Sequence, residues 1–582
     1  MDTLVSLDDE DVSRLTTEID DTLLLDILSR PTAPAQRFVI IEIETYKPGA
    51  STISVDEGYA THPNATLAQL SDAIESTGAI LASDLGYVSL STDPGGPVPY
   101  QPLLAQALKI DNKVYLEGPQ AAVSAAWGAL VLANPDRRYD GIAASWNSDG
   151  RPVAIRTGVK AWDRERQYYV DPPYASLTLM FAGLAKPWFL SDTSLTIPLR
   201  DATYWLERFY QNSFYGGTGG YDGVAALTGK PIPRTRGGTN SYPVQNVTPV
   251  LIDPTNRIYQ YSDGAGTVVN LFEGGAEVIT FQADVADLYS GSTTVGMYRT
   301  DNSRSLFQLG SVPVHAITAN VTGEFPVAGA ITIAAAIARY MLTEDMLLPA
   351  DSIDLTSFSD ADAAYPYIAG MYFDSSASPT GLDVMSVILG SFGAKLIPRR
   401  DGTLAAFVLR ALAPGAVPVM TLDASVLAGL VPRALPATLD PPPFRSRLQY
   451  ARNWTVQTSD INIATATADQ QAFMAGSGKI AAWFSGAILT AFKRPNDRGP
   501  IAGALLIEAD AQAAVDADGA LFGVRRRLYD APVPIETALA LDIGDVVRLR
   551  YAMDDLASGG LGQVVGYQFD SSDPQTVLQV LV

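Results

Sequence analysis

Residues 215–223 read Tyr-Gly-Gly-Thr-Gly-Gly-Tyr-Asp-Gly, and they open a stretch, residues 215–264, that glycine and proline interrupt repeatedly. Glycine adopts positive φ angles at little cost, and proline fixes its own φ, so both residues favour turns over long regular elements. The sequence on either side of the stretch has a β-like pattern. We therefore expect residues 215–264 to form a Gly/Pro linker between two β-rich domains.

The same glycines do not form a nucleotide-binding loop. A P-loop needs four residues between its first glycine and the Gly-Lys pair, and then a Ser or Thr for the magnesium ion. Here five residues separate Gly223 from Gly229-Lys230, and Pro231 follows. The dinucleotide fingerprint also fails, because Asp222 stands where its third glycine should be. We expect no cofactor-binding residues and no cofactor.

Length and composition indicate a large globular protein. The chain has 582 residues, which is too long for one core and suggests roughly three to five domains. Its formal net charge of −23 argues against a general nucleic-acid binder, which needs basic clusters to neutralise phosphates. The start of the chain shows no signal peptide, and no apolar run is long enough for a membrane segment. We therefore expect the protein to be synthesised in a cytoplasm.

The residue types that catalysis and metal binding usually need are scarce. The chain has no cysteine and two histidines, which excludes thiolate nucleophiles and Cys-based zinc or iron–sulfur sites. His62 lies in Thr-His-Pro-Asn, a predicted turn, and His315 lies in a strand-like run, so we expect a structural role for each. Asp516 and Asp518-Gly519 lack the spacing of a calcium loop. We predict no catalytic residues, no metal ligands and no enzymatic activity.

The first part of the chain is predicted to be an acidic helix and then a β-rich domain. Residues 1–36 begin with a Ser-x-x-acid cap at Ser6 and carry one apolar stripe up to Pro31. The β-rich domain spans 37–214, with a short helix at 66–82 and turns at Asn134 and at 147–150. The strands expected in it are 37–45, 113–117, 176–181 and 194–200.

The second half is predicted to contain two further domains. Residues 265–440 form a second β domain with a helical module, in which Thr380 and Asp383 cap a helix that a turn at 398–402 joins to a strand. Residues 441–582 form a C-terminal α+β domain. The other elements expected here are a helix at 331–348, a helix at 508–529, and strands near 403–409, 448–456, 541–551, 562–569 and 576–582. The predicted fold class is mainly β with α+β insertions, in several domains.

Six short motifs follow one another along the chain. They are Asn134-Pro-Asp-Arg-Arg-Tyr-Asp140, 149–156 (Asp-Gly-Arg-Pro-Val-Ala-Ile-Arg), Pro198-Leu-Arg-Asp201, 447–455 (Arg-Leu-Gln-Tyr-Ala-Arg-Asn-Trp-Thr), 541–549 (Leu-Asp-Ile-Gly-Asp-Val-Val-Arg-Leu) and Val564-Val-Gly-Tyr567. With the Gly-rich stretch between them, their order resembles the baseplate hub, or tail-tip, proteins of long-tailed bacteriophages (siphophages) and gene transfer agents. The resemblance runs from about residue 90 to the end, and residues 53–99 and the acidic helix have no counterpart in it.

This resemblance implies a structural virion protein at the tail tip, assembled in the host bacterial cytoplasm. Such hubs are typically homotrimers with two tail-tube-like β-barrel domains per chain. The implied partners are the tail tube or distal tail protein above, a fibre, spike or tip protein below, and the tape measure protein. Phage DNA would pass through the ring without specific binding. The acidic residues would then line the bore, or they would lie on the outer surface and keep the free chain soluble.

The main alternative is a carbohydrate-binding or polysaccharide-degrading tail receptor protein. Three aromatic pairs could stack on sugar rings: Tyr168-Tyr169, Trp188-Phe189 and Tyr204-Trp205. Rings that bind sugars must be exposed, whereas rings that belong to a core are buried. Their solvent exposure therefore distinguishes the two interpretations.

Overall fold

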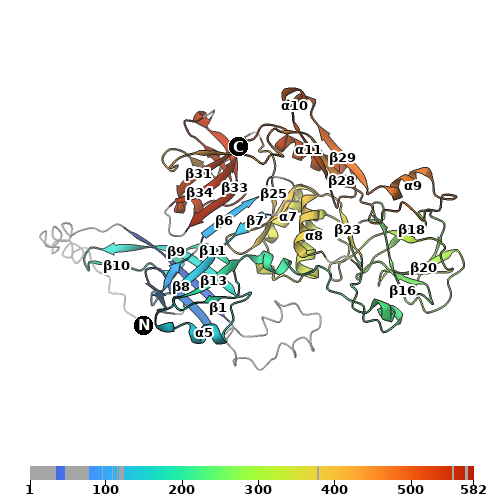
Figure 1. Ribbon diagram of the computed structural model, residues 1–582, viewed down its shortest axis with the longest axis horizontal. Coiled ribbons are helices and arrows are strands. Elements are labelled where there is room, and N and C mark those ends of the chain that lie inside the picture. The colour runs from blue at the N-terminus through green and yellow to red at the C-terminus, as the bar shows by residue number, and fades with distance from the viewer. Residues whose placement is uncertain are drawn as a thin grey trace, which may run out of the picture. The chain divides into compact units, whose positions relative to one another are not determined.

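The computed structural model describes residues 35–45, 78–94, 96–107, 109–114, 116, 123–376, 379–413, 415–553, 556–570 and 575–582 (Figure 1). The protein is mainly β, with helical insertions and several separate sheets, as the sequence predicts. It forms two compact units. Unit 1 holds the described residues up to 107 and those of 129–199, and unit 2 holds those of 109–128 and 200–582. The acidic helix predicted at 1–36 lies outside the described residues, except that Gln36 begins a strand.

Unit 1 is one large sheet with β1 (Gln36–Thr45) near its middle. Burial of apolar side chains fixes the position of β1, since Phe38 and Ile40 pack with Tyr87, Tyr100 and Leu177. The strand order is β3-β4-β2-β1-β9-β11-β13-β8-β5, with β10 on β9 and β12 on β13. The other bounds are β2 (Gly78–Ser83), β3 (Tyr87–Val88), β4 (Pro99–Pro102), β5 (Leu104–Gln106), β8 (Ala129–Ala133), α5 (Asp140–Ser145), β9 (Pro152–Asp163), β10 (Tyr168–Val170), β11 (Thr178–Ala185), β12 (Phe189–Leu190) and β13 (Ser194–Arg200).

One predicted element of unit 1 is wrong in the part that the structure describes. We expected a helix at 66–82, yet its last five residues belong to strand β2. The reason is tertiary, because β2 pairs antiparallel with β1 and buries Ile80 and Ala82. Pairing and burial outweigh weak helical propensity in so short a segment. The turn predicted at 147–150 is confirmed: the Asp149 amide donates to Asn147 Oδ1, and Gly150 has a φ of 68°.

The stretch predicted as a linker contains strands of unit 2. These are β14 (Arg234–Gly237), β15 (Val244–Val247), β16 (Val250–Asp253) and β17 (Ile258–Gln260). All four residues of β14 are buried, and β14 pairs with β23 (Gly370–Phe373) from the helical module. The glycines mark turns between short strands. Such turns and an open linker have the same sequence pattern, so the sequence did not distinguish them. The domain boundaries given above stay a prediction.

Two neighbouring sheets follow in unit 2. One has the order β15-β22-β18, and the other has the order β16-β17-β21-β20-β19. Their remaining strands are β18 (Val268–Glu273), β19 (Thr280–Asp284), β20 (Met297–Asp301), β21 (Leu306–Leu309) and β22 (Ile317–Val321). A cluster that includes Tyr261, Phe307 and Val321 is buried among them. The strand-rich pattern predicted after residue 265 is confirmed.

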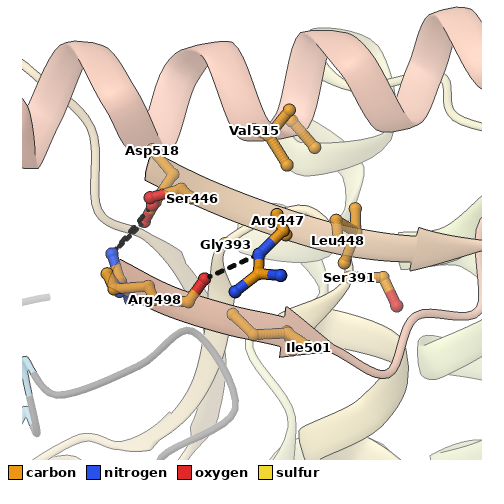
Figure 2. A pocket seen from close by; sticks show the side chains of 11 residues that line it. Ser391, Gly393, Ser446, Arg447, Leu448, Arg498, Ile501, Val515 and Asp518 are labelled. Carbon is orange, nitrogen blue, oxygen red and sulfur yellow. Dashed lines mark hydrogen bonds and ion pairs between the residues drawn. The ribbon is translucent and has the colours of Figure 1, made fainter. Parts of the chain in front are cut away.

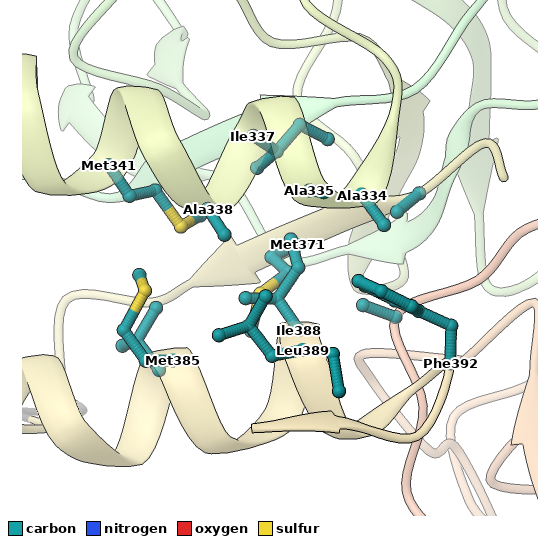
Figure 3. Packing of buried hydrophobic residues seen from close by; sticks show 14 of the residues in the cluster. Ala334, Ala335, Ile337, Ala338, Met341, Met371, Met385, Ile388, Leu389 and Phe392 are labelled. Atoms are coloured by element: carbon teal, nitrogen blue, oxygen red, sulfur yellow. The ribbon is translucent and has the colours of Figure 1, made fainter. Parts of the chain in front are cut away.

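The helical module forms a large core of unit 2, in which α6 (Ala334–Tyr340) and α8 (Gly381–Gly390) pack around β23 (Figure 3). The predicted cap of α8 is confirmed, because the Thr380 amide donates to Asp383 Oδ2 at 2.9 Å and the Asp383 amide donates to Thr380 Oγ1 at 3.2 Å. The helix predicted at 331–348 is α6 followed by a π-helical turn, η6 (Met341–Asp345). The module continues through α7 (Leu355–Ala364), β24 (Ala394–Pro398) and β25 (Leu404–Val408).

The C-terminal region contributes two sheets. In the first, β29 (Lys479–Phe484) and β30 (Asn496–Ile501) flank β28 (Pro443–Tyr450), and α11 (Glu508–Phe522) packs on β28 and β29. Trp483 lies so close to Gly519 and Gly523 that a Cβ at either glycine would come within 2.4 Å of its ring. The helix predicted at 508–529 ends at Phe522, one residue before Gly523. The short helices of the region are α9 (Ala468–Ala475), α10 (Gly486–Ala491) and α12 (Ile535–Leu539).

The second C-terminal sheet takes two strands from far upstream. Its path is β26-β32-β33-β34-β31-β27, and β6 (Lys109–Val114) pairs antiparallel with β33 (Gly560–Asp570). The Asn112 amide group donates to Tyr567 Oη at 3.2 Å within this pairing. The other bounds are β7 (Val123–Ala126), β26 (Met420–Leu422), β27 (Val431–Arg433), β31 (Leu528–Pro534), β32 (Val546–Leu549) and β34 (Gln575–Leu581).

Candidate functional site

The glycine-rich loop at 215–223 is occupied by its own carboxylate. Asp222 accepts hydrogen bonds from the Gly216 amide at 2.8 Å, the Thr218 amide at 3.1 Å and Thr218 Oγ1 at 2.7 Å. These bonds, led by that of the Thr218 hydroxyl, lower the pKa of Asp222. Backbone amides that cradle a phosphate in a P-loop here hold a side chain. The loop geometry therefore agrees with the failed spacing.

Of the two histidines, His315 is described and His62 lies outside the described residues. His315 Nδ1 is 2.7 Å from Asp460 Oδ1, and the neighbouring amide of Ala316 donates to Asp460 Oδ2 at 2.8 Å. The hydrogen bond with His315, first, and the one from Ala316 lower the pKa of Asp460. The pair joins the segment before β22 to a loop more than a hundred residues later in the chain. This arrangement fits the structural role expected for His315.

The acidic residues considered for calcium lie inside α11. Asp516 accepts a hydrogen bond from Gln512, one helical turn earlier, and Asp518 binds Arg498. A helix cannot bring ligands at alternate positions around one ion as a calcium loop does. Across the part of the chain that the structure describes, no group of three or more Asp, Glu, His or Cys is placed to hold a metal ion. Among these residues, no helix has the length and apolar character needed to cross a bilayer.

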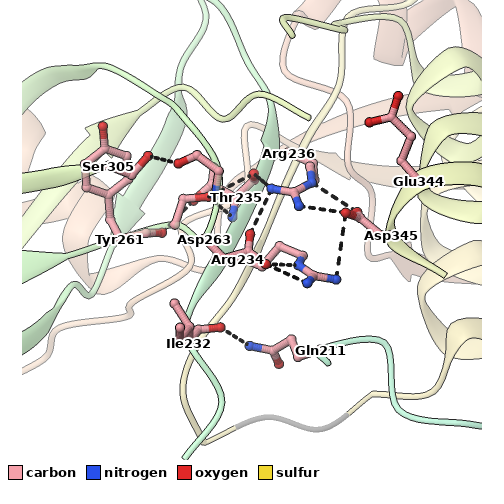
Figure 4. Close-up of polar contacts among 12 residues, drawn as sticks. Gln211, Ile232, Arg234, Thr235, Arg236, Tyr261, Asp263, Ser305, Glu344 and Asp345 are labelled. Atoms are coloured by element: carbon pink, nitrogen blue, oxygen red, sulfur yellow. Dashed lines mark hydrogen bonds and ion pairs between the residues drawn. The ribbon is translucent and has the colours of Figure 1, made fainter. Parts of the chain in front are cut away.

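A buried network of four charges lies between β14 and the helical module (Figure 4). Arg236 binds Asp345 through two bonds, from Nε at 3.0 Å and from Nη2 at 2.7 Å, and its Nη1 is 3.0 Å from Asp263 Oδ1. Arg234 Nε donates to Asp263 Oδ2 at 2.7 Å. The Tyr210 hydroxyl donates to Asp345. Each of the four charged side chains is at least 92% buried by exposed area.

The network is neutral overall, because two guanidinium groups face two carboxylates. Burial acts to raise the pKa of Asp263, but the charges of Arg236 and Arg234 outweigh it and the pKa is lowered. Burial and the charge of Asp345 raise the pKa of Tyr210. A fully paired set leaves no group free for proton transfer, so we interpret it as structural. The network was not predicted from the sequence, where its signal is two arginines at alternate positions, 234 and 236, in a short strand.

Strand β19 of unit 2 has an open edge. Strand β19 ends its five-stranded sheet and pairs on one side with β20, and no described strand pairs with its other side. Four of its five residues are exposed, including Phe281, which is 52% exposed. Proteins usually cover or charge such edges, because unpaired backbone groups there recruit further strands. The edge of β19 is thus a candidate contact for another chain.

Loops beside β19 carry exposed valines, which we call the valine patch: Val278, Val295, Val312 and Val314. Three of them, Val295, Val312 and Val314, are at least 75% exposed. Backbone hydrogen bonds hold their loops together, since the Thr280 amide donates to the Gly296 carbonyl and the Gly310 amide donates to the Met297 carbonyl. Neighbouring exposed apolar side chains of this kind mark interaction surfaces.

The aromatic pairs differ in exposure. Tyr168 is 48% exposed and Phe189 is 65% exposed, whereas their neighbours Tyr169 and Trp188 are half-buried. Trp205 packs against the core of the helical module. Tyr168 and Phe189 lie on β10 and β12, which flank different strands of the unit 1 sheet. The structure therefore gives two separated exposed rings and no combined platform from these pairs.

Two solved structures of tail proteins and a chain of a gene transfer agent virion have a distant likeness to this chain. The chain is similar to a tail protein from Neisseria meningitidis MC58, with 11% identity, 85% of this chain and 96% of that chain covered, and a TM-score of 0.33. For a 43 kDa tail protein of prophage MuSo2 from Shewanella oneidensis, the identity is 8%, the match covers 85% of this chain and 97% of that chain, and the TM-score is 0.30. For a chain from the virion of a native gene transfer agent, the identity is 14%, the match covers 61% of this chain and 84% of that chain, and the TM-score is 0.30. The likeness is distant. No family model and no curated protein matches the sequence.

Proposed function

We propose that this protein is a structural component of a phage tail, positioned at the tail tip as the baseplate hub. The observation that carries the proposal is the open edge of β19 beside the valine patch. An exposed edge and apolar side chains are unfavourable on a free monomer, and burying both against another subunit removes both problems. The collinear motifs between residues 134 and 567, and a chain built of several sheets, support the same function.

The occupant proposed for this surface is a second copy of the chain, in a homotrimeric ring. A cyclic assembly joins two different surfaces of the same chain, so the edge of β19 is covered in every subunit when the ring closes. In the hub proposal the ring joins the tail tube or distal tail protein to a fibre, spike or tip protein, contacts the tape measure protein, and surrounds the DNA channel. It is assembled in the host bacterial cytoplasm and has no enzymatic activity.

The proposal is tested by measuring the mass of purified assemblies and locating the subunit in virions. Native mass spectrometry should give a mass that is a multiple of three chains, and electron microscopy should place the ring at the distal end of the tail. A subunit found in one copy per particle, or in the capsid, would contradict the proposal.

A carbohydrate-binding role is a second candidate, and the exposure of Tyr168 and Phe189 favours it. Replacing either ring by alanine should then weaken adsorption of particles to host cells, while assembly proceeds normally. Trp205→Phe serves as the control, because Trp205 packs against a core. Unchanged adsorption of both variants would remove this candidate.

A further inference from the structure

Helix α11 covers one face of the three-stranded sheet β29-β28-β30. Figure 2 shows Val515 of the helix beside Leu448 of β28, and the ring of Trp483 on β29 lies against Gly519 of the helix. Ala481, two residues before Trp483, is buried in the same core. Successive side chains of a strand point to opposite faces of its sheet, so the residues of β29 that alternate with Ala481 and Trp483 point away from the helix.

The opposite face of β29 is apolar and open. Ile480 is 53% exposed and Phe484 is 59% exposed, and Ala482 between them is exposed as well. On β28, Arg445 lies opposite Phe484, and Arg447 lies opposite Ala482. No described strand pairs with the outer side of β29. We call the row of Ile480, Ala482 and Phe484 the β29 surface.

The charges around the β29 surface are mainly positive. Arg445 and Arg447 share one carboxylate, since Arg445 Nε donates to Asp497 at 2.9 Å and Arg447 Nη2 donates to it at 3.0 Å. Three further basic residues are exposed on β29 and in the segment that joins it to β30: Lys479, Lys493 and Arg494. Residues 443–450 and 479–501 contain one acidic residue, Asp497. This region is therefore positive in a chain whose net charge is −23.

The surface around β19 carries the opposite charge. Residues 273–298 contain four acidic residues and no lysine or arginine, and Glu277, Asp284 and Asp287 among them are exposed. Glu277 precedes Val278 of the valine patch, and Asp284 is the last residue of β19. Two copies of this surface would repel each other, because like charges across an interface are unfavourable. A different, positively charged surface fits it better.

We propose that the β29 surface of one copy covers the edge of β19 and the valine patch of the next copy in the ring. The inference rests on the proposed function and names the second surface that a cyclic assembly of one kind of chain needs. Burial of apolar side chains from both copies supplies affinity. The opposite charges determine which surfaces meet and in which orientation.

Chemical cross-linking tests the contact directly, because the chain has no cysteine and introduced thiols have no background. Thr280→Cys on β19 and Ala482→Cys on β29, both at exposed positions, are combined in one full-length chain. A short bis-maleimide should then join copies into covalent dimers and trimers. Mixing the two single variants should give dimers, which require a contact between copies. Thr280→Cys with Val417→Cys, at a position that is 84% exposed, is the matched control and should give none.

The outcomes separate this inference from the tail-hub proposal. Rings that form without the cross-link would overturn the inference alone. A chain that stays monomeric at every concentration would overturn both, and cross-linked assemblies of another size would support the contact and contradict the homotrimer. Protection of the Ala482→Cys thiol from maleimide in a dilute monomer would show that the chain covers this face itself, and it would also overturn the inference.

Charge reversal is a second test, and its result depends on sign. Lys493→Glu with Arg494→Glu should raise the protomer concentration at half-assembly about tenfold, because like charges then face each other. Adding Glu277→Lys to the same chain should restore part of the assembly, which loss of the fold cannot explain. Arg164→Glu with Arg166→Glu changes the net charge equally at exposed positions of unit 1 and is the control. Equal weakening by the control, or no recovery with Glu277→Lys, would overturn the inference.

Discussion

At the scale of single residues, Arg236 is a fully buried charge. Its guanidinium is fully buried, it bonds Asp345 and Asp263, and it lies over the ring of Phe325 at 5.0 Å from the centroid. A buried charge is tolerated only while its partners remain, so removing one member leaves the others uncompensated. The four charged side chains depend on one another, so the network as a whole, and no single strong bond, joins β14 to the helical module.

The substitution Arg236→Met should lower the free energy of unfolding by about 3–5 kcal/mol, because it leaves two carboxylates with one arginine. Urea denaturation followed by circular dichroism measures the change. Arg137→Gln is the control, since Arg137 pairs with Asp192 on the surface, and it should leave the midpoint nearly unchanged. Equal effects of the two variants would show that the buried network contributes little.

Lys395 should make stability depend on pH in the alkaline range. Burial lowers its pKa to about 8 in the folded protein, against about 10.4 in an unfolded chain. Between these two values the unfolded chain binds more protons, so the contribution of Lys395 to stability rises with pH and is lost as pH falls toward 8. The stability of the wild type relative to Lys395→Met should therefore increase by up to about 3 kcal/mol from pH 8 to 10.4. A difference that is constant with pH would contradict this.

At the scale of elements, the capping box of α8 is the clearest case in which a local signal decides a boundary. Thr380→Ala removes the side chain that accepts from the Asp383 amide and should lower the free energy of unfolding by about 0.5–2 kcal/mol. Ser386→Ala, inside the same helix, should be neutral or slightly stabilising, because alanine favours helix interiors. Thermal denaturation of both variants checks the prediction, and a Thr380→Ala protein as stable as the wild type would contradict it.

Elements with strong local signals were predictable, and elements formed by distant partners were not. The strand at 194–200 alternates apolar and polar residues and is β13. The turn at 398–402 joins β24 to β25, whereas we expected it to join the preceding helix to a strand. The helix predicted up to residue 82 is wrong because its last residues pair with β1 as strand β2. Strand β14 was not predicted because its partner, β23, lies over a hundred residues away.

At the scale of the whole molecule, the valine patch should control assembly and leave the fold intact. The double variant Val295→Asp, Val312→Asp should remain folded, because both side chains are at least 75% exposed. It should fail to form rings, since burying two carboxylates in an apolar contact is costly. Analytical ultracentrifugation measures assembly, and Val417→Asp, at another site that is 84% exposed, is the control. Normal ring formation by the double variant would place the subunit contact elsewhere.

The net charge of −23 gives a prediction about the bore of the ring. If the protein lines a DNA channel, its carboxylates should concentrate on the inner face, because repulsion keeps DNA mobile within a screening length of about 10 Å at 0.1 M salt. A potential map of the assembled ring should then show a negative lumen. A neutral or positive bore would leave the acids with the role of keeping the free chain soluble.

The hairpin of β6 and β7 has a consequence for the order of events during synthesis. Asn112 on β6 bonds Tyr567 on β33, 455 residues later. At translation rates of roughly 5–20 residues per second, the hairpin waits about 20–90 s for the strand that completes its sheet. During this interval its outer edge is open to other nascent chains on the same messenger. A premature stop anywhere before residue 560 removes β33 and leaves the edge of β6 exposed permanently. Even a short C-terminal truncation should therefore affect a hairpin in the first fifth of the chain.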